Sequence, residues 1–206
     1  MPPPPSPTVF VVDDDAAVRK AVSRLLRSVA VFASPREFLA QYDPGTPGCL
    51  VLDIAMPGFN GLQLQTALGK KGSSLPIIFL TGHGDVSKSV RAMKGGAFDF
   101  LTKPVNAKNL LPAIRAAIER DAVARREQAK LSEICARLDT LTPREREVLE
   151  HVVAGKLNKQ IASDLGVTEA TIKMHRARVM AKMKVQAVAD LVRLAERCGI
   201  RGIGQK

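Results

Sequence analysis

The sequence predicts an α/β first half built on a doubly wound parallel sheet, followed by an all-α second half. Short apolar runs over residues 9–12, 49–52, 76–80 and 97–101 indicate buried strands, and helix-period segments lie between them. Regular alternation of strand and helix predicts a parallel sheet with helices on both faces. Residues 141–206 instead show repeated helix starts and glycine stops, which indicate a separate helical domain.

Composition is compatible with two folded domains and excludes a membrane-spanning protein. The chain has 206 residues, of which 46% are hydrophobic, and its apolar runs are all too short to cross a bilayer. The proline-rich start, residues 1–7, predicts a disordered tail rather than a signal peptide. Three widely spaced cysteines, Cys49, Cys135 and Cys198, lack metal-ligand spacing. We therefore expect a reducing, cytoplasmic location and no disulfide framework.

Positive charge is concentrated at the C-terminal end. The net charge is +11, and residues 141–206 alone carry 13 basic and 7 acidic side chains. A basic surplus in the smallest structured part favours a nucleic acid or another anionic surface as its partner. Charge alone is also compatible with a merely basic domain.

Polar side chains follow four predicted strands of the first half. Asp13 and Asp14, Asp53 and Thr81 come directly after an apolar run, and Lys103 comes two residues after one. Because the carboxyl ends of parallel strands share one edge of the sheet, these side chains converge on one crevice. Three close carboxylates repel one another unless a cation joins them, and Mg²⁺ suits such oxygen ligands. Phosphoryl transfer needs this combination of positioning and charge neutralisation.

Taken together, these sequence features resemble those of the receiver domain of a two-component response regulator. The resemblance covers residues 8–120 and is carried by Val12-Asp13-Asp14, the Asp53 turn with Met56-Pro57 and Gly61, Thr81-Gly82, and Lys103-Pro104. It implies a flavodoxin-like, five-stranded sheet in which Asp53 accepts a phosphoryl group from a sensor histidine kinase. Mg²⁺ would be held by Asp14, by Asp13 partly through water, by Asp53 and by the Ala55 carbonyl. Thr81 and Lys103 would bind phosphoryl oxygens, and the Lys103–Pro104 bond would be cis.

The resemblance also implies a conformational switch. Phe100 matches the switch aromatic of the family, and Thr81 would move toward the phosphoryl group so that Phe100 turns inward. Ordinary core packing is the alternative for Phe100. Gly95-Gly96 is expected to end the preceding helix near Lys94, and His83 is expected to be a loop residue.

One stretch departs from the family pattern. The first helix is predicted from Ala16 to about Ser28, and only residues 28–34 remain for the segment that normally holds a helix stop and a full second strand. We therefore expect a truncated or distorted second strand at the edge of the sheet, away from Asp53.

Residues 121–140 predict a helical linker that continues the last receiver helix. The stretch contains neither glycine nor proline, and Leu131, Ile134 and Leu138 form a partial apolar stripe. The linker is either a solvated helix or a helix that packs between protomers, and its stripe is too short for a coiled coil.

Four helices are predicted after the linker. Thr142, Pro143 and Glu145 form a capping-box start, with stops at Gly155, Gly166 and Gly199. Two short helices around a tight turn, followed by a longer basic helix from Thr168 to Met183, match a helix-turn-helix. On this third helix Ile172, Val179 and Met183 should face inward, opposite Ala170, Met174, Ala177 and Ala181.

The C-terminal domain, expected at residues 141–206, resembles the LuxR-type DNA-binding domain from about Leu141 to Arg197. The resemblance is carried by Leu141-Thr142, Arg144-Glu145, Gly155, Asn158-Lys159, Ile161-Ala162, Leu165, Thr171-Ile172-Lys173, His175 and Lys182-Met183. The expected DNA-binding residues are Asn158, Lys159, Thr171, Lys173, Met174, Arg176, Ala177 and Arg178. Arg176 should reach a phosphate, and His175 should pack with a hydrogen bond. The family's fourth helix pairs protomers.

The sequence is thus similar to a response regulator of the FixJ/LuxR type, which is not an enzyme. It would bind DNA as a homodimer formed on phosphorylation. A haloacid-dehalogenase-type phosphatase is disfavoured because Ala55 stands where that family needs a second acid. The alternative is a DNA-binding regulator with an inert receiver, motivated by the shortened second strand.

Overall fold

The structure, a computed structural model, describes residues 6–82 and 86–202, so His83 lies outside the described residues. The chain folds into two compact units, residues 1–125 and 126–206. Within the described residues, no helix combines the length and apolarity needed to cross a bilayer.

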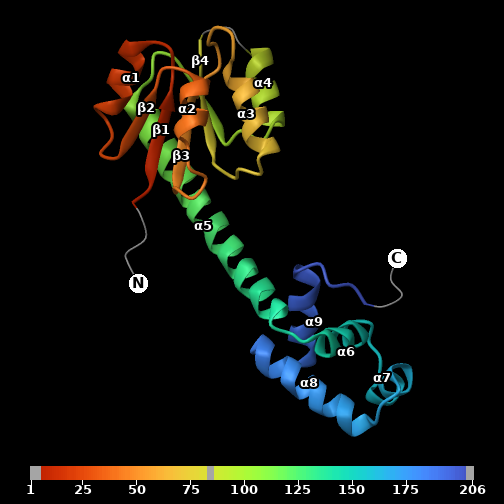
Figure 1. The fold of residues 1–206 in the computed structure, drawn as a ribbon. Helices are drawn as coiled ribbons and strands as arrows, with labels where there is room; N and C mark the ends of the chain where they lie inside the picture. Colours follow the sequence, from red (N-terminus) through yellow and green to blue (C-terminus); the bar gives the residue numbers. More distant parts are fainter. Residues whose placement is uncertain (1–5, 83–85, 203–206) are drawn as a thin grey trace. The chain divides into compact units, whose positions relative to one another are not determined.

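The first unit is a five-stranded parallel sheet in the order β2-β1-β3-β4-β5 (Figure 1). Its strands are β1 (Thr8–Val12), β2 (Val29–Phe32), β3 (Gly48–Asp53), β4 (Ile77–Thr81) and β5 (Asp99–Thr102). Its helices are α1 (Ala16–Ser23), α2 (Pro35–Gln41), α3 (Gly61–Lys70), α4 (Val86–Lys94) and the first part of α5 (Ala107–Asp139). The predicted doubly wound, flavodoxin-like fold is confirmed.

Alternate residues of the central strands face opposite sides of the sheet. Phe10, Leu50 and Phe79 pack in a core cluster with α2, α3 and α4, whereas Val11, Val51 and Ile78 pack in a second cluster with α1 and α5. Both faces of the sheet are therefore covered, which explains why its strands read as continuous apolar runs.

The edge of the sheet differs from the sequence-based expectation. β2 has only four residues, but all four pair in regular parallel register with β1, from Val9 opposite Val29 to Val12 opposite Phe32. Helix α1 ends at Ser23 rather than near Ser28, so residues 24–28 are free to connect it to β2. A helix end can give up a turn to solvent, whereas a shorter β2 would leave backbone groups of β1 without partners. Of the two alternatives expected for this strand, β2 is short but it is not distorted.

Two glycines allow close backbone approaches, Gly61 beside Asp53 at the reactive edge of the sheet and Gly48 at the other end of β3. A Cβ at Gly61 would collide with the carbonyl oxygen of Asp53, and one at Gly48, where φ is +151°, would collide with that of Thr8. At the end of α4, Gly96 has a φ of 87°, and the helix ends at Lys94 as predicted.

The second unit contains the last part of α5 and four helices, α6 (Pro143–Val153), α7 (Asn158–Leu165), α8 (Glu169–Met183) and α9 (Val188–Arg197). The predicted caps are confirmed: Thr142 and Glu145 form a capping box on α6, and Thr168 caps α8. Ile134 and Leu138 of α5 are buried in this unit's core. The apolar stripe of the linker therefore packs on the chain's own C-terminal unit.

The cysteines contradict the expectation that no disulfide forms. Cys135 near the end of α5 is bonded to Cys198, the C-cap residue of α9, although 63 residues separate them in sequence. Spacing along the chain did not indicate this pair because the fold of the second unit brings the two helices together. Cys49 in β3 is free and fully buried.

Candidate phosphoryl site and DNA-binding surface

Four strand ends of the first unit deliver their polar side chains to one place. Asp13 follows β1, Asp53 ends β3, Thr81 ends β4, and Lys103 follows β5. The Lys103 Nζ atom donates a hydrogen bond to Asp53 Oδ2 at 2.8 Å, and it lies 2.8 Å from Asp13 Oδ2 in an ion pair. The Lys103–Pro104 peptide bond is cis, as expected.

The local backbone fixes the orientation of both carboxylates. The Ala55 amide donates to Asp53 Oδ1 at 3.1 Å, and the Asp15 amide donates to Asp13 Oδ1 at 2.9 Å. Arg19, which the sequence did not single out, donates from Nη1 to the carbonyl oxygens of Asp13 and Asp14 at 2.6 and 2.9 Å. It thereby holds the loop that leads from β1 into α1.

The buried charges shift one another's ionisation. Burial raises the pKa of the Asp13 carboxyl, and the hydrogen bond to Lys103 only partly offsets this effect. Burial alone would lower the pKa of the Lys103 ammonium, but its hydrogen bonds to Asp13 and Asp53 and their negative charges raise it instead. The ammonium is therefore kept charged between two carboxylates that have almost no contact with water.

The donor set fits a divalent cation. Asp13, Asp14 and Asp53 each place a carboxylate oxygen within 4.8 Å of the others. Asp13 Oδ2 is buried, and the Lys103 ammonium 2.8 Å away is its close polar contact. Three carboxylates facing one ammonium leave excess negative charge, and hard oxygen donors of this kind are typical of Mg²⁺ sites.

The two proposed switch residues occupy different environments. Thr81 is buried, and its hydroxyl donates to the Gly82 carbonyl oxygen at 3.2 Å. Phe100 has 42% of its surface exposed, so the ordinary core packing that was its alternative does not occur here.

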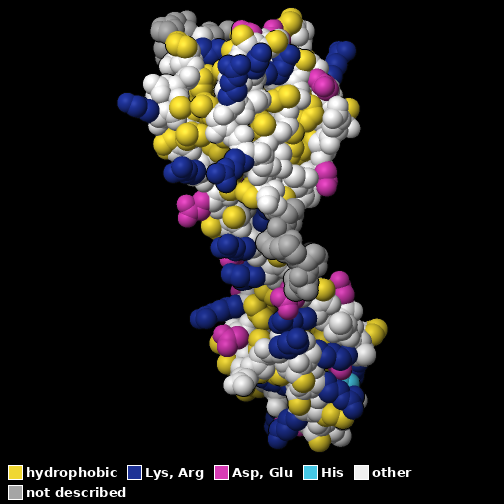
Figure 2. All heavy atoms as spheres, turned by 90° about the vertical axis from the view of Figure 1, so that its left-hand side faces the viewer, with side chains coloured by type: hydrophobic (Ala, Val, Ile, Leu, Met, Phe, Trp, Pro, Cys, Tyr) yellow, Lys and Arg dark blue, Asp and Glu magenta, His cyan; other side chains and the backbone are white. Residues whose placement is uncertain are grey.

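Helix α8 is amphipathic as predicted. Ile172, Val179 and Met183 are buried in the core of the second unit. The opposite side exposes Ala170, Lys173, Met174, Ala177, Arg178 and Ala181. Lys and Arg side chains recur over the visible face of the C-terminal unit (Figure 2). An exposed helix face with small, apolar and basic side chains suits the major groove of DNA.

Two further side chains of α8 were singled out from the sequence, and one of them departs from expectation. Arg176 is half-buried and donates to Asn158 Oδ1 of α7 at 2.7 Å, so it links the two helices of the helix-turn-helix. His175 packs inward, but among the described residues its Nδ1 atom has no hydrogen-bond partner, and the hydrogen bond expected for it is not found at that atom.

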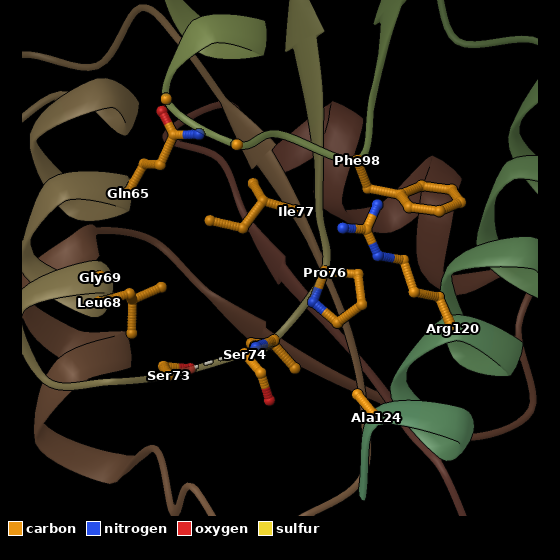
Figure 3. A pocket seen from close by; sticks show the side chains of 13 residues that line it. Gln65, Leu68, Gly69, Ser73, Ser74, Pro76, Ile77, Phe98, Arg120 and Ala124 are labelled. Carbon is orange, nitrogen blue, oxygen red and sulfur yellow. Dashed lines mark hydrogen bonds between the residues drawn. The ribbon is translucent and has the colours of Figure 1, made fainter. Parts of the chain in front are cut away.

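A separate hollow lies at the opposite edge of the sheet, near the start of β4 (Figure 3). Its volume is about 270 Å³, and its lining includes Gln65, Pro76 and Arg120. The Arg120 guanidinium carbon lies 5.6 Å from the centre of the Phe98 ring. Gln65 donates to the Ala92 carbonyl oxygen of α4 at 3.0 Å. The lining contains no carboxylate, so this hollow does not take part in the acidic site.

Comparison with protein families assigns both units. Residues 9–115 match the response regulator receiver domain, and residues 139–195 match the luxR family of bacterial regulatory proteins. The receiver match spans most of the first unit, and the luxR match lies within the second.

Known proteins resemble the chain over nearly its full length. Nodulation protein W of Bradyrhizobium diazoefficiens is 46% identical over 93% of this chain and 86% of its own. The transcriptional regulatory protein FixJ of Azorhizobium caulinodans is 42% identical over 96% of this chain and 95% of its own. The solved structure of the response regulator StyR is 42% identical, covers 94% of this chain and 100% of its own, and superposes with a TM-score of 0.81.

The two family matches lie one in each unit, and the relatives align with the chain across both. FixJ, one of these relatives, is named as a transcriptional regulatory protein. The chain therefore belongs to the two-component response regulators that join a receiver domain to a LuxR-type DNA-binding domain.

Proposed function

We propose that Asp53 accepts a phosphoryl group from a sensor histidine kinase, and that this modification promotes dimerisation and binding to operator DNA. The observation that carries the proposal is the convergence of Asp13, Asp53 and Lys103 at one buried strand edge, with 2.8 Å between Lys103 Nζ and each carboxylate. A nucleophilic oxygen, excess negative charge for a metal and a fixed cation are the elements that phosphoryl transfer requires.

In the proposed reaction an Asp53 oxygen attacks the phosphorus of the phosphohistidine. The O–P bond forms as the N–P bond breaks, and the imidazole leaves. The Ala55 amide holds Asp53 Oδ1, which leaves the second carboxylate oxygen toward Lys103. Asp13, Asp14, Asp53 and the Ala55 carbonyl would hold Mg²⁺, which neutralises phosphoryl charge when bound. Lys103 and Thr81 would bind the phosphoryl oxygens.

The proposed switch connects the site to the surface of α4 and β5. The Thr81 hydroxyl is bonded only to the neighbouring Gly82 carbonyl oxygen among the described residues, so it can be redirected toward a phosphoryl oxygen at small cost. Displacement of Thr81 would open space into which the exposed Phe100 ring turns. Burial of that ring would favour the phosphorylated arrangement by removing apolar surface from water.

The proposed DNA contacts centre on the exposed face of α8. Lys173, Met174 and Ala177 would face base edges, where the methyl group of Ala177 can contact a thymine methyl. Lys159, Thr171 and Arg178 would contact phosphates or guanine edges. Arg176 and Asn158, bonded to each other, would orient α7 and α8 and leave one Arg176 edge for phosphate. Helix α9 would pair protomers.

The proposal takes the protein as cytoplasmic, with a tail at residues 1–7, a receiver at 8–120, a helical linker at 121–140 and a DNA-binding domain at 141–206. Near-complete matches to whole regulators support this organisation. The inert-receiver alternative was motivated by the shortened second strand. β2 is short, with four residues, but its regular pairing with β1 supports an intact receiver sheet.

Binding of DNA before and after phosphorylation tests the proposal. A duplex selected from a random-sequence library by the acetyl phosphate-treated protein serves as ligand. Acetyl phosphate and Mg²⁺ should tighten binding of the wild type to this duplex and leave binding of Asp53→Asn unchanged. Equal affinity of the treated and untreated wild type would reject the switch and favour the inert-receiver alternative.

A further inference from the structure

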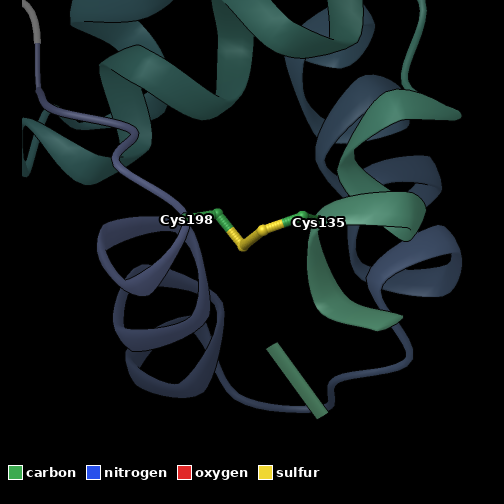
Figure 4. The surroundings of a disulfide bond; sticks show 2 residues. All are labelled: Cys135 and Cys198. Carbon is green, nitrogen blue, oxygen red and sulfur yellow. A yellow bond between two sulfur atoms is a disulfide. The ribbon is translucent and has the colours of Figure 1, made fainter. Parts of the chain in front are cut away.

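A disulfide joins the linker helix to the last helix of the C-terminal unit. Cys135 of α5 and Cys198 of α9 approach with 5.7 Å between their Cα atoms (Figure 4). Cys198 is the C-cap of α9, where the Ile200 amide donates to the Ala195 carbonyl oxygen at 3.0 Å. Cys198 therefore belongs to the hydrogen-bonded end of α9.

Weaker contacts hold the same two helices together. Glu127 lies about two helical turns before Cys135 on α5. Its Oε2 atom is 3.7 Å from Nη2 of Arg197 on α9, in an ion pair between half-exposed side chains. Ile134 and Leu138 are buried in the same core cluster against which Cys198 packs. The residues around the disulfide thus form one α5–α9 junction, in which the disulfide is the covalent link.

The position of this junction gives it a role in communication along the chain. Helix α5 contributes Leu110 and Ile114 to the core of the first unit, and Ile134 and Leu138 to the core of the second. It is the segment through which the phosphoacceptor unit is attached to the DNA-binding unit. The last turns of α5 therefore lie in the second unit and continue the same helix that packs in the first.

We propose that Cys135 and Cys198 form a reversible thiol–disulfide switch that fixes the last turns of α5 on α9 when oxidised and releases them when reduced. The oxidant is a low-molecular-weight disulfide. One protein thiolate attacks it and expels one small thiol, and the second protein thiolate then displaces the other. The protein loses two electrons and two protons, and the small disulfide becomes two thiols. A dithiol reverses the sequence.

Accessibility distinguishes this pair from the third cysteine. Cys135 and Cys198 are both half-buried, so small thiols and disulfides can reach them. Cys49 is fully buried in β3, and burial raises the pKa of its thiol to about 12. A reducing compartment, expected from the cysteine content, is compatible with a pair that rests as two thiols and closes under oxidation.

The first test follows the bond itself in the full-length protein. Samples equilibrated in mixtures of reduced and oxidised glutathione are alkylated under denaturing conditions and weighed. The wild type and Cys49→Ser should both change by two alkyl groups, reversibly, whereas Cys135→Ser should not. Absence of the two-group change after oxidised glutathione, or failure of a dithiol to restore the thiols, would overturn the proposal.

The second test measures release of the helix. Amide hydrogen exchange is followed in peptides covering residues 127–139 in the oxidised and reduced wild type, with peptides from residues 107–120 as internal reference. Reduction should accelerate exchange in the first segment by at least about tenfold and leave the reference unchanged. Equal rates in the two redox states would overturn the proposal. Because the wild type supplies both states, the result does not depend on a variant that folds.

Discussion

In the receiver, the reactive side chains come from four separate strand ends and are mostly buried, whereas the expected DNA-contacting side chains come mainly from one helix and are mostly exposed. The phosphoryl site therefore depends on the whole sheet being in register. The DNA-binding surface depends on how the buried side chains of α8, Ile172, Val179 and Met183, pack in the core of the second unit. Damage to either core should thus disable one function while the other unit stays folded.

The largest effect is expected from Phe38→Ala in the receiver. Phe38 is fully buried and its ring contacts those of Phe10, Phe32 and Tyr42. Loss of the ring should lower the free energy of unfolding of the first unit by about 3–5 kcal/mol. Urea denaturation with separate probes for the two units should show only the first transition moving. Movement of both transitions together would contradict the independence of the units.

The mirror experiment is Ile172→Ala in α8. Its side chain is fully buried on the face opposite the proposed DNA contacts. Truncation of the side chain should lower the free energy of unfolding of the second unit by about 2–5 kcal/mol. It should also weaken DNA binding, because α8 is then packed less firmly on the core. Phosphorylation of Asp53 should be unaffected, which mass measurement of the same sample checks.

A surface substitution should separate binding from stability. Lys173 is exposed on α8 and belongs to the proposed contact set. Lys173→Ala should weaken specific binding by about 1–3 kcal/mol without moving the unfolding transition. Arg146→Ala, which removes an exposed cation on α6 outside the proposed DNA contacts, is the matched control for loss of charge. An unchanged gel-shift midpoint for Lys173→Ala would remove this residue from the proposed contacts.

The smallest effect concerns pH and the second unit. Lys182 lies 2.6 Å from the buried Glu145 carboxylate and, with the Thr142 amide, holds the pKa of Glu145 below its usual 4.5. The resulting stabilisation is present above pH 4.5 and is lost as the pH falls through the lowered pKa. Because Lys182 is one-third exposed, we expect about 1 kcal/mol. Between about pH 3 and 6 the melting temperature of Glu145→Gln should therefore depend less on pH than that of the wild type. An equal dependence on pH in the two proteins would contradict this prediction.

Much of the receiver was predictable because its signals are local. Asp13, Asp53, Thr81 and Lys103 each follow an apolar run, and parallel strands must bring such ends to one edge. Helix starts and stops in the second half were equally readable, since caps are formed by residues close in sequence.

Contacts between distant residues could not be predicted in the same way. The Asp121 carboxylate accepts from the Gly48 amide at 2.9 Å and from Arg125 at 2.7 Å, which anchors α5 to β3 across more than half of the first unit's length. The Cys135–Cys198 bond and the Arg176–Asn158 hydrogen bond likewise join separate helices. The shortened α1 followed from a competition between strand pairing and helix length that no sequence pattern expresses.

The central claim is that Asp53 is the phosphoacceptor of an active receiver. Its most direct test is the intact mass of the purified protein after treatment with acetyl phosphate and Mg²⁺, with Asp53→Asn alongside. A gain of one phosphoryl group, about 80 Da, that disappears in the variant and in EDTA is the predicted result. No gain in a folded protein that still binds DNA, or an equal gain in Asp53→Asn, would contradict the claim.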